Sequence, residues 1–146
     1  MAKKVDWVIH AVMNGLPCHR CGKAPTELLP NCCNCHTHGM EKYGHLDFQL
    51  VLNYPAQEIA RILNTLGLRV QDGERFKNGD LVAGIYEDCD VRLMEYEECG
   101  RTVLRVVIPD AQNRFPDNPD CSYPYTVQAF PTEALFKNIS PEVFPN

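Results

Sequence analysis

The sequence predicts an α+β fold, with a mainly antiparallel sheet and one principal helix packed on a face of it. Three features predict this fold: short stretches in which apolar and polar residues alternate, one apolar stripe at helical spacing, and two C-x-x-C pairs near the N-terminus. The chain has 146 residues, and 45% of them are hydrophobic. This size and composition predict a single domain that covers residues 1–146.

The first part of the sheet is predicted from period-two alternation. Residues 5–13 alternate over their whole length, and residues 47–52 form a second short apolar run. Between them we expect a loop at 17–35, an extended piece at 36–40 and a turn at 43–45. The N-terminal region therefore predicts strands that flank a cysteine-rich insert.

The clearest helix is predicted to begin at Pro55 and to end at Gly67. Proline is favoured at the first helical position, and glycine often ends a helix. The apolar stripe consists of Ile59, Ile62, Leu63 and Leu66. A stripe of this width packs against a sheet, so we expect it to belong to the core.

The second half of the sheet is predicted at residues 81–86, 91–96 and 102–108, and residues 97–100 join the last two strands as a hairpin. From Pro109 to the end, seven prolines fall within 38 residues. Such a density excludes long regular elements. We therefore expect residues 109–146 to wrap the sheet irregularly, with one helical turn at 132–136.

The two C-x-x-C pairs predict a metal site. Cys18 and Cys21 form the first pair, Cys32 and Cys35 form the second, and ten residues separate them. Four thiolates at this spacing are typical of a zinc knuckle, in which C-x-x-C turns aim the sulfurs at one ion. A site with four sulfur ligands has no position for substrate, so this zinc is expected to be structural.

Three alternatives remain for these cysteines. Cys33 could replace Cys32 as a ligand, and His36 could bind the metal or form a hydrogen bond with a thiolate. Iron could occupy the same four sulfurs in place of zinc. C-x-x-C pairs also serve in thiol redox chemistry, although the sequence lacks the βαβ pattern that surrounds such pairs in thioredoxin-like proteins.

A group of histidines offers an alternative site with catalytic potential. His36 and His38 should project to the same side of an extended segment, and His45 could return across a turn to complete a metal site. If the sheet also brings Asp110 close, the group would form a pocket suited to metal-dependent hydrolysis or general acid–base catalysis. The other interpretation is that these histidines stabilise the sheet and that Asp110 caps a turn.

Several segments, taken in order, resemble the uncharacterised bacterial family Domain of Unknown Function 4262. These segments are H-T-H-G-M at 36–40, G-H-L-D at 44–47, L-N at 63–64, G-E-R-F-K-N-G at 73–79, and P-D at 109–110 followed by Pro116. His36 stands where the family more often has an aromatic residue, and Leu46-Asp47 replaces Pro-Glu. The resemblance covers about residues 36–128; it implies an α+β fold and supplies no catalytic residue.

Charge and hydropathy limit the location and the partners. No continuous apolar stretch is long enough to span a bilayer or to form a signal-peptide core, so we expect a cytoplasmic protein. A net charge of -5 disfavours binding to nucleic acid. The sequence therefore predicts a zinc-stabilised binding or interaction module with a protein or small-molecule partner; the alternative is a small metal-dependent hydrolase that uses His36, His38, His45 and Asp110.

Overall fold

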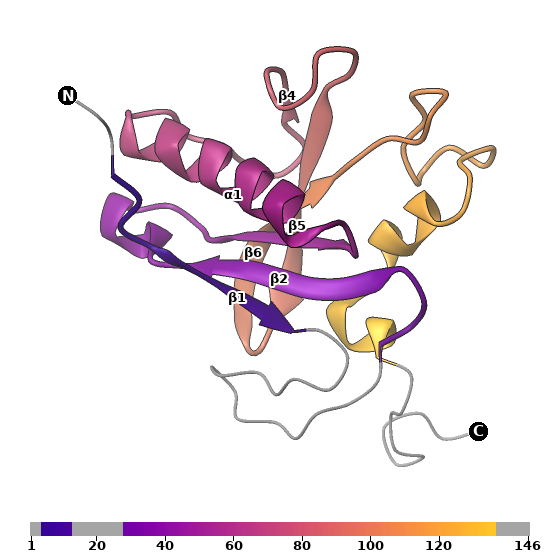
Figure 1. Ribbon diagram of the computed structural model, residues 1–146, viewed down its shortest axis with the longest axis horizontal. Helices are drawn as coiled ribbons and strands as arrows, with labels where there is room; N and C mark the ends of the chain where they lie inside the picture. The colour runs from indigo at the N-terminus through magenta and orange to yellow at the C-terminus, as the bar shows by residue number, and fades with distance from the viewer. Residues whose placement is uncertain (1–3, 13–27, 137–146) are drawn as a thin grey trace.

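The computed structural model describes residues 4–12 and 28–136 and contains one six-stranded sheet (Figure 1). The strand order is β1-β2-β3-β6-β5-β4, and every neighbouring pair is antiparallel except β3 and β6. The strands are β1 (Val8–Val12), β2 (Cys32–His38), β3 (Phe48–Leu52), β4 (Leu81–Val82), β5 (Val91–Glu98) and β6 (Arg101–Val107). The predicted α+β class with a mainly antiparallel sheet is confirmed.

The principal helix, α1 (Ala56–Gln71), packs on β3 and β2. Its buried stripe contains the four residues predicted from the sequence, and Gly67 and Val70 extend it. The prediction that Gly67 ends the helix is wrong, because α1 continues to Gln71. A glycine is needed at helical position 67 because the ring of Trp7 packs directly against it, and a Cβ there would clash with the ring. The helix is shorter and more polar than a membrane span requires, as is every helix in the described ranges.

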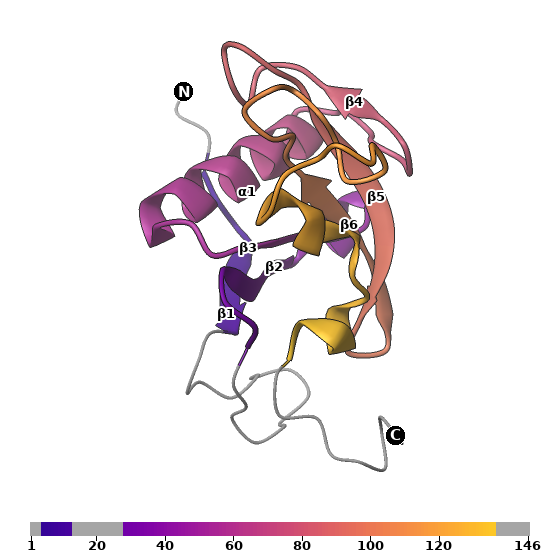
Figure 2. The same ribbon diagram turned by 90° about the vertical axis from the view of Figure 1, so that its right-hand side faces the viewer.

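The C-terminal segment packs on the face of the sheet opposite to α1 (Figure 2). It contains two 3-10 helices, η2 (Tyr125–Ala129) and η3 (Thr132–Leu135). A third, η1 (Met40–Tyr43), follows β2. η3 matches the helical turn predicted at 132–136, and the described part of this segment is compatible with the predicted irregular wrap. Residues 137–146 lie outside the described part.

The two faces of the sheet have different chemistry. Side chains alternate along a strand, and Gln49 forms hydrogen bonds with Arg105 and with Thr132 of η3. Its neighbours Phe48 and Leu50 therefore face α1, in the apolar core. The η3 side of the sheet carries polar residues that are almost entirely buried: Asn34, His36, Gln49, Glu98 and Arg105.

Two strand boundaries differ from the prediction. β2 begins at Cys32, within the stretch predicted to be a loop, because its backbone pairs with β3 from Cys32↔Leu52 onward, with a register shift before Cys35. β4 contains only Leu81 and Val82 instead of residues 81–86, because Gly84 has a φ of 91°, which an extended strand does not allow. The remaining strands agree with the sequence to within one to three residues at each end.

Candidate metal centre

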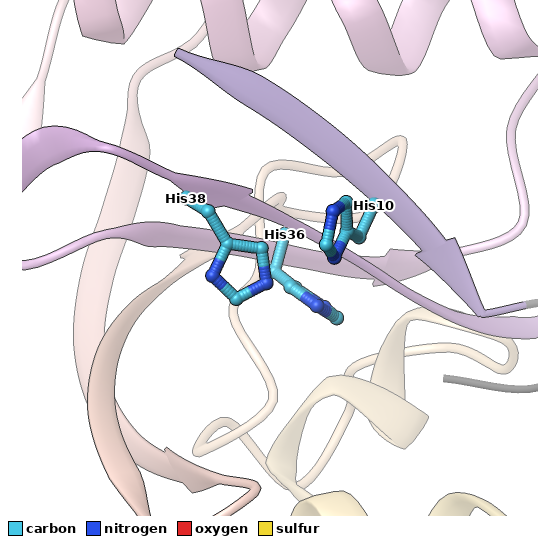
Figure 3. Close-up of side chains that lie close together, drawn as sticks. All are labelled: His10, His36 and His38. Atoms are coloured by element: carbon cyan, nitrogen blue, oxygen red, sulfur yellow. The ribbon is translucent and has the colours of Figure 1, made fainter. Parts of the chain in front are cut away.

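Three histidines come together at the β1–β2 edge of the sheet (Figure 3). His10 lies on β1, and His36 and His38 lie on β2. One potential ligand atom from each ring falls within 4.8 Å of the other two, and the ring centroids are 4.2 to 5.8 Å apart. Among the described residues, this is the one group of three or more histidine, cysteine or acidic side chains whose ligand atoms come this close.

The register of the two strands explains this convergence. His10 pairs directly with His36 across the antiparallel ladder, so their side chains project from the same face of the sheet. His38 is two residues beyond His36 and therefore shares that face. All three rings project to the side of the sheet opposite to α1, as Figure 3 shows.

His36 is the most buried of the three. Its side chain is fully buried, and its Nδ1 lies 3.1 Å from Oδ1 of Asn34. Within the described part of the chain, its Nε2 has no hydrogen-bond partner. Burial lowers the pKa of His36 to about 4, so the ring is neutral at neutral pH and carries one lone pair that a metal can use.

A carboxylate lies next to this ring. Oε2 of Glu98 is 3.7 Å from Nε2 of His36, and Oε1 of Glu98 accepts a hydrogen bond from Nε of Arg101 at 3.0 Å. Burial alone would raise the pKa of Glu98, but interactions with Cys99, His36 and Arg101 outweigh it and hold the pKa below the usual range. A buried negative charge beside the imidazoles favours a cation at this position.

The distances are compatible with a metal after small rotations of the rings. Zinc binds imidazole nitrogens at about 2.0–2.1 Å, so tetrahedral nitrogen ligands are about 3.3 Å apart. Three imidazole ligands are the set found in catalytic zinc sites, and they also suit copper, nickel and iron.

Of the four predicted cysteine ligands, the structure describes two. Cys18 and Cys21 lie outside the described residues. Cys32 and Cys35 lie in β2, both almost fully buried, in an extended strand and not in the predicted turn. The thiol of Cys33 donates to the backbone carbonyls of Leu50 and Leu52. The interaction between Cys33 and Cys35 raises the pKa of Cys33 and lowers that of Cys35. The four-cysteine zinc site stays a prediction.

His45, which the sequence groups with His36 and His38, has a different environment. Its Nε2 accepts a hydrogen bond from the backbone N–H of Phe76 at 3.0 Å, and its Nδ1 donates to the carbonyl of Leu46 at 2.7 Å. The ring also packs between Phe48 and Phe76. Nε2 therefore attaches the loop at 73–79, and Nδ1 is used by the neighbouring carbonyl of Leu46, which fits the structural interpretation of this histidine.

Asp110 is likewise engaged locally. Its carboxylate accepts hydrogen bonds from the backbone N–H groups of Gln112, Arg114 and Ser122 and from the Arg114 guanidinium. Burial alone would raise the pKa of Asp110, but these donors outweigh it and hold the pKa well below its usual range. Asp110 borders a pocket of about 200 Å³ lined by tyrosines, and no histidine lines it. This arrangement fits turn chemistry, and the structure does not bring Asp110 together with the three histidines.

His10 is the ligand candidate that the sequence did not indicate. It belongs to the alternating stretch at 5–13, but its position opposite His36 depends on a strand pairing across the 19 residues that separate β1 from β2. The available signal was a histidine on the polar side of a predicted strand, next to a strand that carries H-x-H.

Comparison of the chain with protein-family models, with curated proteins and with solved structures finds no match, so the resemblance to Domain of Unknown Function 4262 stays a prediction.

Proposed function

We propose that this protein is a cytoplasmic metal-binding module in which His10, His36 and His38 hold one divalent cation, with zinc as the first choice. The observation that carries the proposal is the buried Nε2 of His36, which has no hydrogen bond within the described chain and lies next to two further imidazoles. A buried polar atom without a partner costs about 1–3 kcal/mol, and a metal bond would remove that cost. The Glu98 carboxylate would offset part of the cation's charge.

The metal would also have a structural effect. β1 is an edge strand, and β2 is its only neighbour in the sheet that the structure describes. A cation bound by His10 and by the two β2 histidines would cross-link the strands. A metal that binds only the folded state, at a free concentration about 100 times its dissociation constant, stabilises the fold by about 2.7 kcal/mol. The module would then be more stable with metal than without it, in keeping with a structural zinc.

Cobalt(II) spectroscopy tests this proposal and separates it from the four-cysteine site. Cobalt(II) occupies zinc sites; nitrogen ligation gives weak visible bands, whereas thiolate ligation adds strong charge-transfer absorption in the near ultraviolet. We expect visible bands that are lost in His36→Ala and in His10→Ala and retained in His45→Gln, the matched control. Because cobalt(II) bound by thiolates also absorbs in the visible region, the comparison is made in a Cys18→Ser background. Unchanged visible bands in both alanine variants in that background would contradict the proposal.

The cysteine zinc site is a second proposal with its own signature. Cys32 and Cys35 are buried in β2, the same strand that carries two of the histidines. If Cys18, Cys21, Cys32 and Cys35 bind a second cation, charge-transfer absorption should appear and should disappear in Cys18→Ser. The absence of that absorption, with the visible bands intact, would leave the histidine centre as the metal site.

The enzymatic alternative is a small metal-dependent hydrolase at the same three histidines. A site with three imidazole ligands can present metal-bound water, and Glu98 is close enough to His36 to belong to its surroundings. Zinc-dependent hydrolysis of an activated ester, lost in His36→Ala, would favour the enzyme. Zinc binding without such activity favours the module.

A further inference from the structure

A directional chain of hydrogen bonds leads from the core to His36. Nε of Arg105 donates to Oε1 of Gln49 at 2.7 Å, and Nε2 of Gln49 donates to Oδ1 of Asn34 at 2.9 Å. The same Oδ1 lies 3.1 Å from Nδ1 of His36. All four side chains are buried, with at most 2% of their surface exposed, so water competes little for these bonds.

Arg105 sets the direction of the chain at one end. A guanidinium group has only hydrogen-bond donors, and burial lowers the pKa of Arg105 to about 10, so it is protonated at neutral pH. Gln49 must therefore present its oxygen to Arg105 and its NH₂ group to Asn34. Thr132 agrees with this orientation: its hydroxyl donates to the carbonyl of Glu97 and accepts from Nε2 of Gln49 at 3.2 Å.

Asn34 passes this direction on to His36. Because Gln49 offers N–H, Asn34 must present its oxygen, and Nδ2 of Asn34 then points to the Glu98 carboxylate at 3.5 Å, which is an acceptor. An oxygen next to Nδ1 of His36 requires Nδ1 to carry the proton. In a neutral imidazole, Nε2 is then the unprotonated nitrogen.

We propose that Arg105, Gln49 and Asn34 are positioning residues that fix His36 in the tautomer whose Nε2 can bind a metal. The inference rests on the proposed metal centre for its purpose, but the tautomer itself can be measured without metal. Partners of this kind orient metal-ligating histidines, and their loss costs about 10- to 100-fold in metal affinity. None of the three touches the metal in this scheme.

Two near-isosteric substitutions separate the effect of the hydrogen-bond direction from the effect of an added negative charge. Gln49→Glu and Asn34→Asp each replace one buried amide by a carboxylate. In Asn34→Asp, the new carboxylate would still accept from Gln49 and from Nδ1 of His36, so the tautomer should be kept. In Gln49→Glu, the new carboxylate can only accept, so Asn34 should turn its NH₂ group toward that carboxylate and toward His36. This rotation moves the imidazole proton to Nε2, on the side of Glu98.

The test uses protein labelled with ¹⁵N-histidine and freed of metal by chelation, with long-range ¹H–¹⁵N spectra at neutral pH to assign the His36 tautomer. We expect Nδ1–H in the wild type and in Asn34→Asp, and Nε2–H in Gln49→Glu. Zinc affinity by calorimetry should fall about 10- to 100-fold in Gln49→Glu and be retained in Asn34→Asp. Circular dichroism establishes whether each variant is folded. If Gln49→Glu does not fold, Gln49→Met takes its place, and we then expect a mixture of the two His36 tautomers.

The outcomes separate the two proposals. An Nε2–H tautomer in wild-type protein, or the same tautomer and zinc affinity in Gln49→Glu as in Asn34→Asp, would overturn the positioning role. The predicted tautomers without zinc binding in any variant would support the hydrogen-bond chain and overturn the metal centre.

Discussion

Gly67→Ala is expected to destabilise the protein, although alanine is the better helix former. Gly67 lies in the interior of α1, where alanine would gain about 1 kcal/mol from helix propensity. A Cβ at this position would be 2.7 Å from Cε2 of Trp7 and closer still to Cζ2. The ring of Trp7, which is 5% exposed, would have to move.

The cost follows from what holds the ring in place. Nε1 of Trp7 donates to Oδ1 of Asn64 at 2.9 Å, and the backbone of Trp7 lies against Gly39 on the other side. Overpacking of this kind costs about 1–3 kcal/mol, and partial exposure of the ring adds to it. After the gain in propensity, we expect a net loss of about 1–2 kcal/mol, which corresponds to a fall in melting temperature of about 2–8 °C at this chain length.

Urea unfolding followed by circular dichroism measures this loss, and the fluorescence of the single tryptophan reports the displaced ring. The matched control is the same substitution in a Trp7→Val background, where the clashing ring atoms are gone. There Gly67→Ala should stabilise by about 1 kcal/mol. The same change in both backgrounds, or stabilisation of the wild type, would refute the reasoning.

Two further substitutions test the surroundings of the candidate metal centre. Gly39→Ala should cost about 2–3 kcal/mol in urea unfolding, because Gly39 has a φ of 132° and its Cβ would lie 2.9 Å from Cβ of Trp7; a loss below about 1 kcal/mol would contradict this. Arg105→Met should cost about 4 kcal/mol or more in the same assay, because Gln49 and the carbonyls of Gln128 and Phe130 would lose a buried donor; a variant as stable as the wild type would count against the account.

Local pattern was sufficient to predict most of the fold. Period-two alternation and one helical stripe depend on neighbours a few residues away, so the sequence predicted β1, β3, β5, β6 and the start of α1 to within about three residues. The end of α1 was mispredicted because the role of Gly67 depends on Trp7, which is distant in sequence. The parallel pairing of β3 with β6 likewise depends on contacts between residues that are distant in sequence.

The candidate site was predictable only in part. H-x-H on one strand placed His36 and His38 on a shared face, and the structure brings them together. His45 and Asp110 were grouped with them from sequence proximity and from residue type, but each has local backbone partners. His10 could not be identified, because the register between two strands that are 19 residues apart in sequence cannot be predicted from local pattern.

The most direct test of the account is a comparison of zinc binding between the wild type and a His10→Ala/His36→Ala/His38→Ala variant, with metal content measured by elemental analysis after calorimetric titration. The difference between the two proteins removes any contribution from cysteine ligands. We predict that the wild type binds one zinc ion more than the variant. Equal zinc content in two folded proteins would contradict the central claim.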